Sequence, residues 1–141
     1  MDRLSPKQRS FNMSQIKSKN TKPELIVAQQ LDDHKLQYQR QWAVPGKPDF
    51  AFPELKVAIF VNGEFWHGRR ISNIKNKLSE FWIEKITKNI KRDRKNYKLL
   101  KKEGWKVVKI WDKDLLKHKR REINKILRSV NESIRESDLK I

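Results

Sequence analysis

Residues 56–68 read Lys-Val-Ala-Ile-Phe-Val-Asn-Gly-Glu-Phe-Trp-His-Gly. The first six, Lys56 to Val61, form an apolar, β-branched run that is typical of a strand in the centre of a sheet. The turn that follows carries Asn62, Glu64 and His67, whose side chains can bind a metal ion or accept a proton. This stretch therefore predicts a buried strand that delivers polar groups to one edge of a sheet.

The segments before this strand carry clear start and turn signals. Thr21 is placed as a helix N-cap, Pro23 lies in the first turn, and Glu24 completes a capping box. These signals predict a helix that runs to about residue 34. Two extended segments follow, Tyr38–Val44 and Asp49–Phe52, and Pro and Gly residues separate them.

A second, long helix is predicted from about Ser79 to Glu103, with Gly104 placed to end it. Asn89 and Asp93 fall inside the apolar stripe of this helix. The basic residues 68–78 before it show no period and predict a loop. A strand at 105–111 and an amphipathic helix beyond residue 120 complete the domain, which we place at residues 21–141 behind a flexible N-terminal arm, residues 1–20.

The charge balance points to a polyanionic partner. The chain has 141 residues, with 34 Lys and Arg against 17 Asp and Glu, and a net charge of +17. Such a field attracts nucleic acid, and binding should weaken steeply as salt rises. A membrane surface is the alternative, but it would call for a basic amphipathic helix with little else.

Cysteine is absent, which excludes disulfides and thiolate zinc sites and suits a reducing compartment. The first residues lack an apolar signal core, and no run is long enough to span a bilayer. We therefore expect a cytoplasmic protein of the bacterial type, associated with the nucleoid when it acts, with no membrane contact.

Asp49 and His67 are the first candidates for chemistry. Asp49 opens an apolar segment, and it is either a turn residue after Pro48 or a metal-binding carboxylate at a sheet edge. Mg²⁺ prefers oxygen ligands, so the Asp49 carboxylate with the Val61 main-chain carbonyl or the Asn62 side chain would suit it. His67 is then a general base for a water, or a histidine on a surface turn.

Asp93 is a carboxylate in the apolar face of the long helix, which is costly unless the charge is paired. It either forms a salt bridge with Arg92, Arg94 or Lys85, or it faces the site together with Asn89 and orients His67. Phe65 and Trp66 raise a similar choice, because adjacent residues of a strand cannot both enter one core. Either one of them packs, or the two form a wedge that stacks on DNA bases, with Phe11 and Met13 of the arm as a weaker second wedge.

Five blocks of this sequence resemble the very short patch repair (Vsr) endonucleases, in the family's order and spacing from about residue 10 to 115. Taken together the blocks are highly specific, although each one alone is weak. They read Asn12-Met13-x-x-Ile16-x-x-Lys19-x-Thr21-x-Pro23-Glu24, Pro45-Gly46-Lys47-Pro48-Asp49, Phe60-x-Asn62-Gly63-x-Phe65-Trp66-His67-Gly68, Phe81-Trp82-x-x-Lys85-Ile86-x-x-Asn89-x-x-Arg92-Asp93 and Gly104-Trp105-x-Val107.

The resemblance implies a restriction-endonuclease-like α/β fold, with a mixed central sheet flanked by helices. It also implies a Mg²⁺-dependent nick 5′ of the T in a T·G mismatch of double-stranded DNA. Asp49 would bind the metal, His67 would activate water, Asp93 would act through His67 or a metal-bound water, and Glu24 would lie nearby. The residues expected to contact DNA are Phe65 and Trp66 beside the mismatch, Met13 from the other groove, and the basic side chains of Lys19, Arg69, Arg70, Lys88 and Arg92.

The chain departs from the family pattern in two places. Well-studied members hold a structural zinc where this chain has Glu64, Arg69, Arg70, Ile71 and Asp112, so we expect no zinc site. The loop must then be held by packing or by salt bridges from Glu64. Asn62 is the second departure; it is neutral, so it can serve neither as a base nor as an anionic metal ligand, which leaves His67 as the base.

Two other readings remain open at this stage. A restriction-type or loosely specific nickase of the same fold would cut with or without a mismatch. A DNA-binding protein with a decayed metal site would bind duplex and cut nothing. In all of these cases we expect a monomer. If the chain is a repair enzyme, mismatch-repair proteins are candidate partners.

Overall fold

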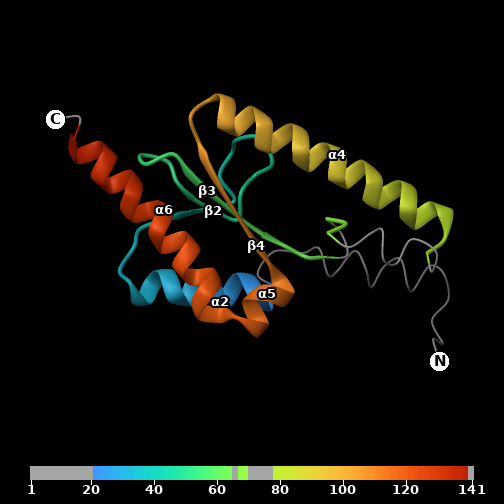
Figure 1. Cartoon of the computed structure of the whole chain (residues 1–141), viewed down its shortest axis with the longest axis horizontal. Helices are drawn as coiled ribbons and strands as arrows, with labels where there is room; N and C mark the ends of the chain where they lie inside the picture. The colour runs from blue at the N-terminus through green and yellow to red at the C-terminus, as the bar shows by residue number, and fades with distance from the viewer. Residues whose placement is uncertain (1–20, 65–66, 70–77, 140–141) are drawn as a thin grey trace.

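The structure, a computed structural model, describes residues 21–64, 67–69 and 78–139 (Figure 1). The predicted arm, residues 1–20, lies outside the described residues, as does most of the predicted loop 68–78. None of the described helices is long and apolar enough to cross a membrane.

A four-stranded mixed sheet forms the centre of the described structure, with strands in the order β1-β2-β3-β4. The strands are β1 (Gln39–Arg40), β2 (Phe50–Phe52), β3 (Val57–Asn62) and β4 (Lys106–Trp111). β1 pairs with β2 and β2 with β3 in antiparallel fashion, whereas β3 and β4 are parallel. The β-branched run was thus correctly predicted as a central strand, and the mixed sheet is confirmed.

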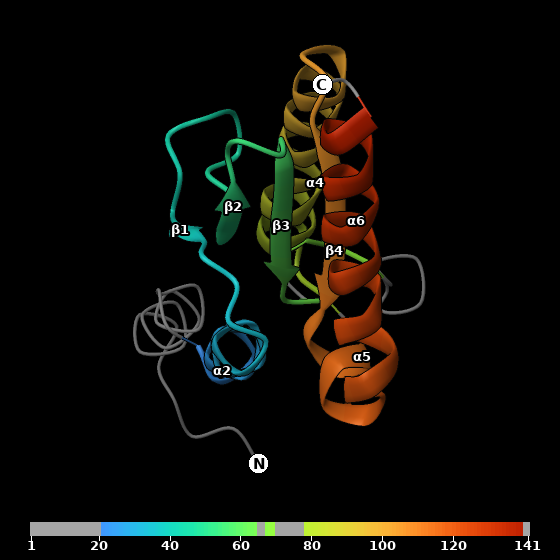
Figure 2. The same cartoon turned by 90° about the vertical axis from the view of Figure 1, so that its left-hand side faces the viewer.

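Helices cover both faces of this sheet (Figure 2). α4 (Glu80–Lys102) lies on one face, and α2 (Lys22–Asp33), α5 (Asp112–Lys117) and α6 (Lys119–Leu139) lie on the other. The side chains of β3 alternate between these layers: Ile59 packs in the core with α2 and α6, whereas Phe60 packs with Leu100 of α4. Asn62, two residues after Phe60, therefore lies on the α4 side.

The predicted strand Tyr38–Val44 is wrong in its length, because only Gln39–Arg40 pairs with β2. Gln41 has a φ of 51°, in the left-handed region, and this conformation ends the strand. A short helix, α5, also went unpredicted between β4 and α6.

The ends of the first two helices agree with their sequence signals. The Thr21 hydroxyl accepts the Glu24 N–H at 3.5 Å, as the capping box predicts. Gly104 follows the last turn of α4 with a φ of 90°, a conformation that glycine adopts without strain.

Candidate active site

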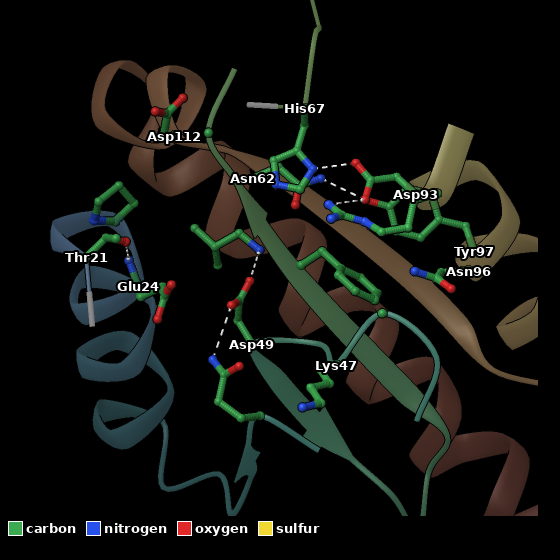
Figure 3. Close-up of a pocket in the computed structure, with 17 residues that line it drawn as sticks. Thr21, Glu24, Lys47, Asp49, Asn62, His67, Asp93, Asn96, Tyr97 and Asp112 are labelled. Atoms are coloured by element: carbon green, nitrogen blue, oxygen red, sulfur yellow. Dashed lines mark hydrogen bonds and ion pairs between the residues drawn. The ribbon is translucent and has the colours of Figure 1, made fainter. Parts of the chain in front are cut away.

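A cavity of about 700 Å³ lies at the carboxyl end of β3, between α2 and α4 (Figure 3). It gathers residues from five separate parts of the chain. All five residues predicted for catalysis line it together with Val61: Glu24, Asp49, Asn62, His67 and Asp93. The other lining residues include Arg92, which was predicted to contact DNA, and Thr21, Gln41, Lys47, Asn96, Tyr97 and Asp112.

Asp49 is anchored at both carboxylate oxygens. Because β2 begins one residue later, the Val61 N–H on that side of β3 donates to Asp49 Oδ2 at 2.6 Å. Gln41 Nε2 donates to Asp49 Oδ1 at 3.4 Å. Burial raises the pKa of Asp49 from 3.8 to about 6, the nearby charge of Glu24 adds to that rise, and the Val61 hydrogen bond opposes it. The protein therefore holds the Asp49 carboxyl group where its partial burial disfavours the ionised form.

The oxygen donors at this corner fit a hard divalent cation. In a strand the N–H and C=O of one residue point to the same side, so the Val61 carbonyl faces the edge on which Asp49 lies. Within the described ranges, no three His, Cys, Asp or Glu side chains are placed to hold a metal ion. A cation here would take one carboxylate and one carbonyl from the protein and the rest from water or phosphate, which is how Mg²⁺ commonly binds.

Glu24 lies in the first turn of α2 and is almost fully buried. Its Oε2 atom forms an ion pair with Arg40 Nη2 at 3.0 Å, so it ties α2 to β1 beside the site. From the resemblance, Glu24 was expected to lie near the catalytic residues, and it lines the same cavity as Asp49.

His67 and Asp93 are in direct contact, His67 Nδ1 against Asp93 Oδ2 (Figure 3). Arg92 Nη2 lies 3.3 Å from the other Asp93 oxygen, so Asp93 forms one of the expected salt bridges and also contacts His67. With Nδ1 occupied, Nε2 is the ring nitrogen of His67 that remains for other partners. Asn89 lies buried on the same helix one turn earlier.

Gly68 explains how the segment after β3 can lie so close to α4. Its φ is 61°, and a Cβ atom there would lie 2.4 Å from Ile90 Cδ1 and 2.7 Å from Ile86 Cγ2. Only glycine fits both the backbone conformation and the space. The close approach carries the neighbouring His67 to Asp93.

A cluster of charged residues anchors the same segment to α5. Arg69 Nη1 lies 3.0 Å from Glu64 Oε1 and 2.6 Å from Asp114 Oδ2, and its guanidinium lies over the Trp111 ring, 5.1 Å from the centroid. Lys113 Nζ adds a contact 3.6 Å from Glu64 Oε2. The expected salt bridge from Glu64 is confirmed. Arg69, which was predicted to contact DNA, instead pairs with Glu64 and Asp114 within the protein.

Two residues that hold site side chains in place were not predicted from the sequence. Gln41 bonds Asp49, and Tyr97 Oη accepts a hydrogen bond from Asn62 Nδ2 at 2.9 Å. Burial raises the pKa of Tyr97 to about 12. The position of Tyr97 one turn after Asp93 was a usable signal, since such residues share a helix face. No sequence signal pointed to Gln41.

The predicted DNA contacts are only partly within the described structure. Lys88 is exposed on α4, and Arg92 is half-exposed at the cavity. Five of these residues lie outside the described ranges, so their roles stay predictions: Met13, Lys19, Phe65, Trp66 and Arg70.

Comparison with known proteins places the chain among DNA endonucleases. The family model described as DNA mismatch endonuclease Vsr matches residues 1–73. The type II nicking enzyme V.NmeDIP of Neisseria meningitidis serogroup C is 46% identical over 122 residues, covering 84% of this chain and 82% of that protein. The type II nicking enzyme V.HpaIIP of Haemophilus parainfluenzae is 42% identical over 124 residues, covering 84% and 87%. The DNA mismatch endonuclease Vsr of Escherichia coli (strain K12) is 37% identical over 107 residues, covering 74% and 69%.

Proposed function

The chain belongs to the Vsr family of DNA endonucleases, and from this premise we propose that it nicks duplex DNA 5′ of the T in a T·G mismatch, with Mg²⁺ as cofactor. Its mixed sheet between two layers of helices is a restriction-endonuclease-like α/β fold. One observation carries the proposal: the half-buried Asp49 carboxylate and the His67–Asp93 pair line one cavity in a chain of net charge +17.

Asp49 and the Val61 carbonyl would hold the Mg²⁺ at the end of β3. The bound ion supplies positive charge that stabilises the charge developing on the scissile phosphate. Gln41 and the Val61 N–H keep the Asp49 carboxylate oriented toward the cavity. Because this carboxylate is already held in place, little reorganisation accompanies binding.

His67 takes the proton from the attacking water in this proposal. Asp93 holds Nδ1 of the ring, so Nε2 is presented to the cavity, and the carboxylate stabilises the imidazolium that forms. Arg92 borders both the pair and the cavity, where its positive charge suits a phosphate oxygen. The glutamate of α2, Glu24, supports the site through Arg40.

Binding to the duplex would draw on the positive field and on aromatic insertion. Lys88 and Arg92 from α4, with Lys19 and Arg70, would neutralise phosphates. Phe65 and Trp66 would open the base stack beside the mismatch, with Met13 entering from the other groove. A mismatched step costs less to deform than a paired one, which favours insertion there.

Two relatives are named type II nicking enzymes, a name that mentions no mismatch. The second candidate is therefore a restriction-type or loosely specific nickase, which cuts with or without a mismatch. This candidate uses the same residues for hydrolysis. It differs only in predicting equal cleavage of matched and mismatched duplexes that share the sequence.

Asp49→Ala separates both candidates from a binding protein with a decayed site. The variant should lose cleavage, because it lacks the metal-binding carboxylate, while its affinity for duplex changes little. Filter binding in EDTA and gel analysis of nicking with Mg²⁺ measure the two properties. Equal cleavage by Asp49→Ala would remove this carboxylate from the mechanism, and a wild-type protein that binds tightly but never nicks would leave only the decayed-site reading.

A further inference from the structure

Asn62 ends β3 with a side chain that is 3% exposed and yet lines the active-site cavity. The pleat of β3 turns this side chain toward α4, where its Nδ2 atom donates to Tyr97 Oη at 2.9 Å. An amide side chain has one donor end and one acceptor end. Since Tyr97 holds the donor end, the orientation of the acceptor Oδ1 is set as well.

The Oδ1 atom of Asn62 is left for a partner in the cavity. No described side chain or backbone group is hydrogen-bonded to it. In the described part of the chain, Ser133 Oγ on α6 is the only buried side-chain oxygen or nitrogen without a hydrogen-bond partner. Asn62 Oδ1 is not among them, so it keeps access to the cavity that Asn62 lines.

Tyr97 is itself held firmly. Its ring packs edge-on against Phe60, with centroids 5.0 Å apart, and Lys109 Nζ lies over the ring at 5.1 Å from its centroid. Phe60 and Lys109 are neighbours in the β3–β4 ladder, so two strands of the sheet fix the ring. The Tyr97 hydroxyl therefore has little freedom to follow a moving amide.

One helix thus orients two groups of the site. Asp93 and Tyr97 are one turn apart on α4; Asp93 contacts His67, and Tyr97 contacts Asn62 (Figure 3). We propose that Tyr97 is a positioning residue, which holds the Asn62 amide so that Oδ1 accepts a hydrogen bond from the water that His67 deprotonates. The inference rests on the proposed nuclease function. It gives neutral Asn62 a role that needs neither charge nor basicity.

The test is a double-mutant cycle on the nicking step with Tyr97→Phe, Asn62→Ala and the double variant. Tyr97→Phe keeps the ring and removes only the hydroxyl. The other tyrosine offers a matched control: Tyr38→Phe removes a hydroxyl that donates to Asp32 at 3.0 Å, outside the cavity. Single-turnover rates are measured with Mg²⁺ and saturating protein, and duplex affinity is measured in EDTA.

We expect Tyr97→Phe to lower the rate by about 10-fold to 100-fold, the range that misplacement of a reacting group produces, with duplex affinity within about twofold. In the Asn62→Ala background the same change should have no further effect, because coupled residues are non-additive. Tyr38→Phe should cleave like the wild type. Additive losses, an unchanged rate in Tyr97→Phe, or a parallel loss of affinity would each overturn the proposal.

A spectroscopic readout keeps the test valid if a variant folds poorly. In ¹⁵N NMR of the wild-type protein without DNA, the Asn62 side-chain NH₂ should exchange slowly with water. Its resonance should shift in Tyr97→Phe and stay in place in Tyr38→Phe. An unchanged resonance in Tyr97→Phe would contradict the hydrogen bond between Asn62 and Tyr97. If the wild-type protein does not nick, the proposed function fails instead, which the cleavage assay shows separately.

Discussion

His67 Nδ1 contacts Asp93 Oδ2, and this contact joins the segment after β3 to the middle of α4, across 26 positions of sequence. Both side chains are largely shielded from solvent. The pair gives the imidazole one fixed orientation beside the cavity, with Nδ1 toward α4. A general base needs such orientation before its basicity matters.

Asp93→Asn should therefore reduce the nicking rate while the protein stays folded. The amide has nearly the same shape but cannot stabilise an imidazolium, so we expect a loss of about 10²-fold to 10⁴-fold, the usual contribution of general base catalysis. Single-turnover cleavage with Mg²⁺ measures the loss. Asp138→Asn, at the exposed end of α6, is the control. A rate within threefold of wild type would show that His67 works without Asp93.

Gly68→Ala should weaken both folding and cleavage. A methyl group at this position meets Ile90 and Ile86 in a backbone conformation with positive φ, so the segment must move off α4. We expect a destabilisation of about 1–3 kcal/mol in urea unfolding, typical of overpacking.

Gly63→Ala is the matched control for this stability measurement. Its added Cβ would meet only Asp112 Oδ2, at 3.8 Å, and its backbone carries no positive φ. Equal stability of Gly68→Ala and Gly63→Ala would contradict the close packing of residue 68 on α4.

Asp49→Asn should stabilise the metal-free protein at neutral pH. The folded pKa of about 6 lies above the ordinary value of 3.8, so the folded state binds this proton more tightly. The resulting stability is fully present below pH 3.8 and is lost as pH rises through 6. The variant should gain up to about 3 kcal/mol over wild type at pH 7.5 and nothing near pH 3.5.

Urea unfolding in EDTA across this pH range measures that difference. Added Mg²⁺ should raise the melting temperature of the wild type only, because ligand binding stabilises the folded state. A stability difference that does not vary with pH would show that burial of the Asp49 charge is not its cause.

Arg69→Met tests the charged cluster that anchors the His67 segment to α5. Among the described residues, the change leaves the buried Glu64 carboxylate with Lys113 as its remaining ion-pair partner, at 3.6 Å. We expect a loss of about 1–3 kcal/mol, the cost of a poorly satisfied buried group, and partial recovery in the double variant Glu64→Gln with Arg69→Met. Arg135→Met, exposed on α6, is the control for removing an arginine. No recovery in the double variant would show that the loss does not come from the Glu64 carboxylate.

Local patterns in the sequence were enough for the central strand and the long helix. The β-branched run before Asn62 and the 3.6-residue period around Asp93 each specify an element and the face it buries. The same period placed Asp93 on the side where it contacts His67. These predictions succeeded because each depends on neighbours within a few turns or residues.

The features that could not be predicted depend on contacts between distant segments. Tyr97 lies 35 residues from Asn62, and Asp114 lies 45 residues from Arg69. The left-handed conformation of Gln41 ends β1 and turns the Gln41 side chain toward Asp49. Glycine and asparagine commonly adopt this conformation, so a glutamine there gives no sequence signal for it. Only the packed sheet and helices bring such residues together.

The most direct test of the central claim is cleavage of two end-labelled duplexes that are identical except for one T·G in place of C·G. Each is incubated with the protein in Mg²⁺ and in EDTA. We predict one nick, 5′ of the mismatched T, in Mg²⁺ only. Equal nicking of both duplexes would contradict the mismatch specificity, and undiminished nicking in EDTA would contradict the role of the metal.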